Sequence, residues 1–349
     1  MKTTMLNYLL LLLALPFALH AGEVNGKYKK EKRISKTFSV SSNALLDIDN
    51  QYGNIYVTTW DENKIAIDVV ITVGADKQEV AEKRINAINV DFAATSAKAT
   101  ARTIIGNFSG HKVSMSINYT VKIPKQGSIM LKNIYGSIKT GEINGKANIQ
   151  CDYGPIDIQS LNGSGNIIEI DYSKVSRIGY VKSLTMSADY SDIVIDQCEK
   201  LIFNGDYSLL TIKSVADLSF NGDYGDLKID SVHNFNGNGD YITLKIKSAK
   251  DKVNLTSDYS TIIIDVENTL KSLNFNGDYG NIDIKSSPGF SFDFELNGDY
   301  FNVSGLSGAN FTKRHQKDEE LYLKGYYKAQ GKSKINITSD FGNAIFIIK

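Results

Sequence analysis

The chain has 349 residues, of which 42% are hydrophobic, and its 39 basic residues balance its 39 acidic residues. Only 2 Cys and 4 Pro are present, so the chain is neither a disulfide scaffold nor a collagen-like fibre. The balanced charge also excludes a strongly basic nucleic-acid binder.

The first 21 residues have the three-part form of a secretory signal peptide. Lys2 precedes an apolar run from Tyr8 to Leu19, which is short for a membrane span and is broken by Pro16. We therefore expect cleavage after Ala21 and no transmembrane segment in the mature chain. The sequence predicts an exported protein located in the periplasm, at the cell surface or outside the cell.

Residues 22–128 are expected to form a β-rich capping region with one helix. The helix is predicted over Gly74–Ile88, where Ala81, Ile85 and Ile88 share one face. Strand-like alternation marks Ile34–Val40, Leu45–Asp49, Asn54–Thr59, Lys64–Val73, Ala99–Ile105 and Lys112–Ile123. We expect this region to cover the first coil of the domain that follows, because an open sheet edge would recruit other chains.

Residues 129–349 contain an internal repeat of about 18 residues, which we interpret as one repeat domain. Its marker is an aromatic residue, preceded mostly by Asp and followed mostly by Gly or Ser. It occurs at Tyr135, Tyr153, Tyr172, Tyr190, Tyr207, Tyr224, Tyr241, Tyr259, Tyr279 and Tyr300. The same unit returns at Phe341, 41 residues after Tyr300, and Tyr52 is an early outlier.

Each repeat unit contains two short apolar runs with a period of two, which is typical of strands. The fourth residue before the aromatic is apolar except at Gly237, and the third residue after it is always apolar. Turn residues such as Asn-Gly-Asp-Tyr allow a corner between the two strands. The sequence therefore predicts an all-β fold, a parallel β-solenoid of about 18-residue coils. An antiparallel β-sandwich is less consistent with one aromatic environment repeated ten times.

A charged stretch near the C-terminus, Thr312–Glu320, interrupts the period. We expect it to loop out or to protect the final edge of the stack.

The segment over residues 117–158, INYTVKIPKQGSIMLKNIYGSIKTGEINGKANIQCDYGPIDI, resembles the central pattern of the bacterial putative-adhesin family of exported β-repeat proteins. In that family a strand that ends in a Val-x-Ile-Pro-Lys corner leads into glycine-punctuated coils. The resemblance implies a solenoid and a location in the cell envelope. It implies an adhesive role and brings no catalytic residues.

An Asp precedes the aromatic in nine successive units, from Asp152 to Asp299. Stacked carboxylates at solenoid spacing would repel by about 0.9 kcal/mol in water, so something must offset the repulsion. One hypothesis is a calcium ladder, whose candidate ligands are Asp206, Asp223, Asp240, Asp258 and Asp278. The favoured alternative is hydrogen bonding to backbone N–H groups of the turns, because the Gly-x-Asp spacing of calcium-binding repeats is missing. We assign no cofactor.

The aromatic column has two interpretations as well. Its structural repeat residues are Tyr153, Tyr172, Tyr190, Tyr207, Tyr224, Tyr241, Tyr259, Tyr279 and Tyr300. The rings could offer a flat surface to sugar rings or a peptide. Their parity with the apolar residues favours packing in the interior or at a corner instead.

Signals for catalysis are weak. His111, His233 and His315 lie far apart without the spacing of metal ligands, and every Asp in the column belongs to the repeat. Cys151 and Cys198 have different phases in distant coils, so we expect buried free thiols and no disulfide.

We interpret the chain as a non-catalytic, exported, adhesin-like module of the cell envelope with a binding or structural role. Its outward residues, such as Lys228 and Asp230, would present repeat faces to a polymer or protein partner, for example a cell-surface glycan or an envelope protein, but not a nucleic acid. The alternative is a carbohydrate-active enzyme on a parallel β-helix scaffold, in which paired carboxylates serve as acid and base. A cluster of unlike residues that breaks the repeat would favour the enzyme, and a uniform face favours binding.

Overall fold

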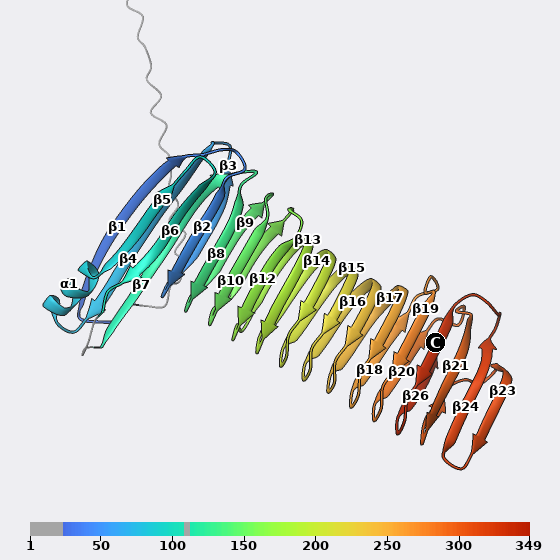
Figure 1. Ribbon diagram of the computed structural model, residues 1–349. Coiled ribbons are helices and arrows are strands. Elements are labelled where there is room, and N and C mark those ends of the chain that lie inside the picture. Colours follow the sequence, from blue (N-terminus) through green and yellow to red (C-terminus); the bar gives the residue numbers. More distant parts are fainter. Residues whose placement is uncertain (1–23, 108–111) are drawn as a thin grey trace, which may run out of the picture.

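The computed structural model describes residues 24–107 and 112–349, so the predicted signal peptide over residues 1–21, and His111, lie outside the described residues. The molecule is an elongated stack of β coils with a broader β-rich region at its N-terminal end (Figure 1). Successive coils pair in parallel, as β14 (Asp192–Asn204) does with β15 (Leu209–Asn221) and β15 with β16 (Asp226–Asn238). The predicted all-β parallel solenoid is confirmed.

Each coil crosses the stack twice and builds two sheets around one apolar interior. The segment after each aromatic corner belongs to the first sheet, and the segment before the next corner belongs to the second sheet. From β13 (Ser176–Asp189) to β17 (Thr243–Thr256), one long strand bends near a buried residue such as Val232 and serves both sheets. In the other coils the segments are separate strands: β8 (Ser128–Ile134), β9 (Ile138–Ile143), β10 (Ala147–Asp152), β11 (Ile156–Leu161), β12 (Asn166–Asp171), β18 (Thr261–Val266), β19 (Ser272–Asn276) and β20 (Asn281–Ser286).

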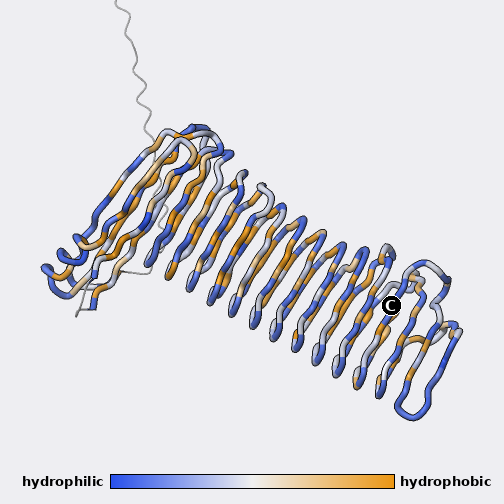
Figure 2. The backbone as a smooth tube through the Cα atoms, in the orientation of Figure 1, coloured by the Kyte–Doolittle hydropathy of each residue, from blue (hydrophilic) through white to orange (hydrophobic). Residues whose placement is uncertain are grey.

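Hydrophobic and hydrophilic residues alternate along the strands, and the corners are hydrophilic (Figure 2). This alternation places apolar side chains inside and polar ones outside. In the unit around Tyr224, Phe220 and Leu227 are buried, whereas Lys228 is exposed. At Gly237 the ring of Phe235 takes the interior space, because an added Cβ would lie 2.5 Å from that ring. The interior is therefore filled even where the repeat lacks a side chain.

The expected inward position three residues after the aromatic is wrong in one unit. Val175 is 47% exposed. The turn after Tyr172 holds one extra residue, so Ser176 pairs with Ile193 and takes the buried place. In the coil of Tyr300, Val303 is half-buried.

The first coil of the stack lies earlier in the sequence than the repeat analysis indicated. β2 (Leu45–Gln51) pairs in parallel with β8, and β3 (Ile55–Trp60) pairs in parallel with β9. The outlier Tyr52 is therefore a corner of the same array. A separate domain over residues 22–128 stays a prediction.

Residues 61–127 are inserted between this first coil and the next one. They form β4 (Lys64–Ala75), α1 (Gln78–Asn86), β5 (Ile88–Ala94), β6 (Lys98–Ile105) and β7 (Val113–Pro124). β4 and β7 pair antiparallel and extend the first sheet, while β5 and β6 extend the second sheet in the same way. β1 (Tyr28–Ser39) pairs with β4 as the outermost strand, and its many lysines discourage pairing with another chain.

The predicted helix is confirmed but is shorter at both ends. Gly74 lies in β4 and Ile88 begins β5, a strand that the sequence analysis missed. Ala81 and Ile85 are buried where α1 packs against β1 and β4. The six predicted strands of this region are all present.

The last coil in the sequence is not the last coil of the stack. β25 (Lys334–Thr338) pairs in parallel with β19 on one side and with β21 (Phe292–Asp299) on the other. β26 (Asn343–Ile348) likewise lies between β20 and β22 (Asn302–Ser304). Figure 1 shows β26 between β20 and β21. The order of the coils in space therefore departs from their order in the sequence, because the coil of Phe341 lies between those of Tyr279 and Tyr300.

The charged stretch Thr312–Glu320 does not loop out. Most of it belongs to β23 (Asn310–Lys317), which pairs antiparallel with β24 (Glu320–Tyr327), and β24 pairs antiparallel with β21. β23 is exposed along its whole length. This charged hairpin covers the edge of the second sheet, as the alternative expectation required.

The two cysteines are free and buried, as predicted. Burial raises the pKa of Cys151 and of Cys198 to about 12, so neither thiol is a reactive thiolate at neutral pH.

Candidate binding surfaces

Twelve aromatic residues form one continuous column along a corner of the stack. In spatial order they are Tyr52, Tyr135, Tyr153, Tyr172, Tyr190, Tyr207, Tyr224, Tyr241, Tyr259, Tyr279, Phe341 and Tyr300. All twelve have φ between 51° and 60°, a left-handed conformation that costs an L residue about 1–2 kcal/mol. The N–H groups bond to the neighbouring coil, as from Tyr224 to the carbonyl of Asp240 at 3.0 Å. The chain therefore turns from one sheet to the other at the aromatic residue itself.

The expectation of interior packing for these rings is wrong, and the expectation of corner packing is correct. Apart from Tyr52 at 37%, the residues are 48–53% exposed. Neighbouring rings stack with centroids 4.9–5.3 Å apart. Because each ring covers the face of the next, mainly edges and hydroxyl groups reach the solvent. The column therefore does not offer the open aromatic faces on which sugar rings stack.

The Asp column beside it is tied to the backbone of successive coils. In spatial order from Asp171 to Asp340, each carboxylate accepts a hydrogen bond from the N–H of the next Asp, at 2.7–3.3 Å. The calcium-ladder candidates Asp206, Asp223, Asp240, Asp258 and Asp278 all make this bond. Such donors favour the charged carboxylate and offset the repulsion along the column. Within residues 24–107 and 112–349, no three His, Cys, Asp or Glu residues gather as a metal-ion cluster.

Asp299 and Asp152, at the two ends of this column, accept no such bond among the described residues, and Asp152 is the half-buried one of the two. Its carboxylate has a weak side-chain partner, Gln150 at 3.5 Å, and no backbone donor among the described residues. Burial, followed by the charge of Asp171, raises the pKa of Asp152. The charged form of this carboxylate is therefore less well stabilised than it would be in water.

The first sheet carries a column of alternating charge. In the six coils from Tyr190 to Tyr279, the sixth residue after the aromatic is, in order, Asp196, Lys213, Asp230, Lys247, Asp265 and Lys285. Lys213 pairs with Asp196 at 2.6 Å, and Lys247 pairs with Asp230 at 2.7 Å. The column is largely neutralised by its own pairs, which at this exposure add little stability.

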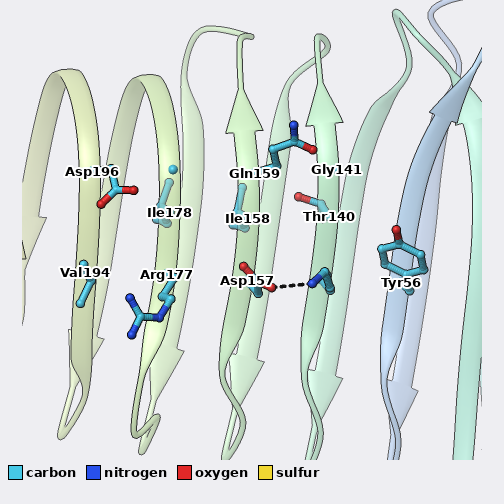
Figure 3. A pocket seen from close by; sticks show the side chains of 12 residues that line it. Tyr56, Thr140, Gly141, Asp157, Ile158, Gln159, Arg177, Ile178, Val194 and Asp196 are labelled. Atoms are coloured by element: carbon cyan, nitrogen blue, oxygen red, sulfur yellow. Dashed lines mark ion pairs between the residues drawn. The ribbon is translucent and has the colours of Figure 1, made fainter. Parts of the chain in front are cut away.

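A hollow of about 420 Å³ interrupts the first sheet nearer the N-terminal end (Figure 3). Its floor includes Gly141 and Gly179, and its lining includes Arg177 and Tyr56. Lys139 Nζ pairs with Asp157 Oδ2 at 2.8 Å, and this contact raises the pKa of Lys139 through the hydrogen bond and the charge. Here unlike side chains do replace the repeat pattern.

The second sheet carries an uncharged strip that we call the amide surface. It consists of two columns of outward residues, one that begins at Asn204, three positions before its aromatic, and one that begins at Ser219, five positions before its aromatic. Its members are Asn204, Ser219, Asn221, Asn236, Asn238, Asn254, Thr256, Asn274, Asn276, Asn336 and Thr338. Side-chain amides bond along the strip, with Asn274 donating to Asn254 at 2.8 Å and Asn336 donating to Asn274 at 2.7 Å. A shallow groove of about 250 Å³ runs between the two columns.

Sequence reasoning identified the aromatic and Asp columns but missed both the hollow and the amide surface. The hollow could have been found from the glycine at Gly141, which breaks an outward column of larger side chains. The amide surface could have been found by aligning outward positions rather than inward ones, except for Asn336 and Thr338, whose coil lies out of order.

No protein-family profile and no curated protein matches this sequence. Solved structures that resemble it include a putative adhesin from Bacteroides fragilis, with 14% identity over 91% of this chain and 97% of that chain and a TM-score of 0.29. A putative cell adhesion protein from Clostridium sporogenes has 9% identity over 92% of this chain and 100% of that chain, with a TM-score of 0.21. A putative lipid binding protein from Parabacteroides distasonis has 10% identity over 90% and 96%, with a TM-score of 0.37. These scores are too low to bear on function.

No helix in the described part of the chain is long and apolar enough to cross a membrane.

Proposed function

We propose that this protein is a non-catalytic, exported binding module of the cell envelope that holds a polymer or protein partner along its lateral faces. The observation that carries the proposal is repetition of surface chemistry. Outside the hollow, each sheet repeats its kinds of side chain over several successive coils, and the stack spans eleven ring-to-ring steps of about 5 Å, a length of roughly 55 Å. Such a surface offers many equivalent weak contacts, which suit an extended partner.

The hollow around Arg177 is the observation that favours the alternative, a carbohydrate-active enzyme. Its lining holds two carboxylates, Asp157 and Asp196. Both are engaged in ion pairs, with Lys139 and Lys213 respectively. Carboxylates that act as acid and base must reach the sugar, and here each carboxylate is held by a lysine instead. The binding module is the better-supported function.

A binding experiment on the mature chain separates the two functions. Purified protein is immobilised and exposed to envelope extracts and to a panel of soluble glycans, and the eluted polymers are sized. The proposal expects retention of at least one partner with its chain length unchanged. If the wild-type protein shortens a polymer and the Asp157→Asn variant does not, the protein is the enzyme of the alternative. If the protein retains no component at all, the proposal is overturned.

A further inference from the structure

We infer that the amide surface is a binding site for a neutral, hydroxyl-rich polysaccharide that lies along the two columns of the second sheet. This inference rests on the proposed binding function and names its partner class and its face. No charged side chain lies within the two columns from Ser219 to Thr338. Charged residues occur on both flanks, for example Asp217 and Asp223, so the neutral strip is a local property.

The side chains of the strip match the hydrogen-bonding character of sugar hydroxyls. An Asn amide has two N–H donors and a carbonyl oxygen with two lone pairs, and Thr and Ser hydroxyls both donate and accept. The bonds between Asn254, Asn274 and Asn336 use only part of that capacity. Apart from the buried Oδ1 of Asn336, the remaining donors and acceptors are available to a ligand that, like a sugar hydroxyl, needs both.

The amide ladder also fixes the orientation of these groups before any ligand binds. Asn238 donates to Asn221 at 3.1 Å, so the pattern occurs in both columns. Side chains already held in place lose less conformational entropy when they bind, which favours affinity. The flanking Asp223 carboxylate accepts the N–H of Asp240 and is partly satisfied within the protein.

The strip is continuous in space although it is discontinuous in sequence. Asn336 and Thr338 belong to the inserted final coil, yet they pair in register with Asn274 and Asn276 and continue both columns. The shallow groove is lined across this junction by Asn254, Thr256 and Thr338 among others. The inserted coil thus continues the strip with uncharged side chains, although it comes from a distant part of the sequence.

The other sheet differs, because its short amide ladder of Asn281, Asn343 and Asn302 is accompanied by a charged column. Its equivalent region carries the alternating column from Asp196 to Lys285, whose charges pair with one another. A charged polymer would compete with these pairs, whereas a neutral polymer on the amide surface displaces no ion pair. Binding to the strip should therefore be insensitive to salt, because it releases no counterions.

The test is affinity electrophoresis of the mature protein in gels that contain a neutral polymer (an α-glucan, a β-glucan, a mannan or a galactan) or an acidic polymer (polygalacturonate or alginate). We expect retardation by at least one neutral polymer, changed less than twofold by 0.5 M NaCl. The variant N254A/N274A should weaken retardation at least tenfold. The variant Asn236→Lys, at an exposed position with no amide-ladder bond, should do the same without removing a ladder contact.

The matched control is K245A/T261A, two exposed outward residues of the first sheet, which should bind as the parent does. Unfolding curves establish that each variant is folded. Retardation by acidic polymers alone would overturn the inference, and so would equal binding by Asn236→Lys and the parent. Loss of binding in K245A/T261A would place the site on the first sheet, which overturns the inference but leaves the proposed function intact. If the immobilised protein retained no envelope component or glycan, both the proposed function and this inference would be overturned.

Discussion

The corner residue resolves a conflict between backbone strain and side-chain packing. A bulky residue with positive φ is unfavourable, yet twelve occur at equivalent corners. Each stacked ring pair contributes about 0.5–1.5 kcal/mol, which offsets strain of similar size. The tyrosine is retained because stacking compensates locally for the conformation that turns the chain.

Substitutions at Tyr224 separate the two contributions. Tyr224→Ala keeps the strain and loses two stacking contacts, so it should destabilise the protein. Tyr224→Gly also loses the stacking but relieves the strain, so it should be about 1 kcal/mol less harmful than Ala. Tyr224→Phe should be close to neutral. Urea unfolding measures all three, and a glycine variant less stable than the alanine variant would contradict this account.

Asp152 gives a pH-dependent prediction. Its pKa is raised in the folded state, so its contribution to stability is fully present below the unfolded pKa of about 3.9 and is lost as the pH rises through the folded pKa. At pH 7 the charged form is unfavourable, so Asp152→Asn should raise the Tm, and the gain should vanish near pH 3.

The control for this prediction is Asp223→Asn. The Asp223 carboxylate accepts the N–H of Asp240 at 2.7 Å, so losing its charge should lower the Tm at pH 7. Thermal melts from pH 3 to 7 test both variants. A lower Tm for Asp152→Asn at pH 7 would show that its environment has been misassigned.

At the scale of the strand, the inward or outward direction of a side chain determines how much its substitution changes stability. Phe220 and Leu227 point inward, so replacing either with Ala should cost about 2–5 kcal/mol through lost burial and the cavity that remains. Lys228 points outward, and its nearest acidic partner, Asp226, is 4.0 Å away, so Lys228→Ala should change stability by less than about 0.5 kcal/mol. Chemical denaturation measures the three changes, and equal effects of Phe220→Ala and Lys228→Ala would refute the assigned phase.

The Asp column acts as an element that links coils, and calcium distinguishes this role from an ion-binding ladder. The carboxylates already accept backbone N–H groups, so we expect millimolar CaCl₂ to leave the Tm nearly unchanged. Differential scanning calorimetry with and without chelator tests this. A rise of several degrees that chelator reverses would support the calcium ladder instead.

The inward positions of the strands could be predicted from sequence because period-two alternation directly encodes which side chains face the core. Parity could not fix the direction of Tyr224, since the corner begins at that residue and alternation ends there. The extra turn residue near Val175 was equally hidden, because Val is a stronger strand former than Ser176, which in fact takes the buried position. Outward columns such as Asn254 and Asn274 depend on register between coils, which only stacking defines.

At the scale of the whole molecule, regular repetition in the sequence predicted the solenoid but not the order of its coils. A coil from Lys334 to Ile348 has the same pattern wherever it lies in the stack. β25 of this coil lies between β19 and β21, and the hairpin of β23 and β24 covers the other edge of β21 at the end of the second sheet. The repeat pattern thus specifies how neighbouring coils pack but not which coils are neighbours.

Deleting residues 333–349 tests this arrangement. In a stack that follows the chain, losing the last coil would remove one interface, but here it removes two, with β19 and β20 on one side and β21 and β22 on the other. We expect hydrogen exchange protection to be lost over residues 292–327 and kept over residues 200–245. Full protection of residues 292–327 in the deletion variant would contradict the interleaved order.

The interleaved coil also determines the order in which the coils can pack during synthesis of the chain. Because the chain is synthesised from its N-terminus, each earlier coil can pack on the preceding one as it emerges. The coil of Tyr300 cannot pack in this way until residues 334–348 have been synthesised. Until then β19 and β20 present bare edges. A product truncated by even one coil would stay open at that point and be exposed to proteases and to pairing with other chains. The stack can therefore close at this point only after residues 334–348 have been synthesised.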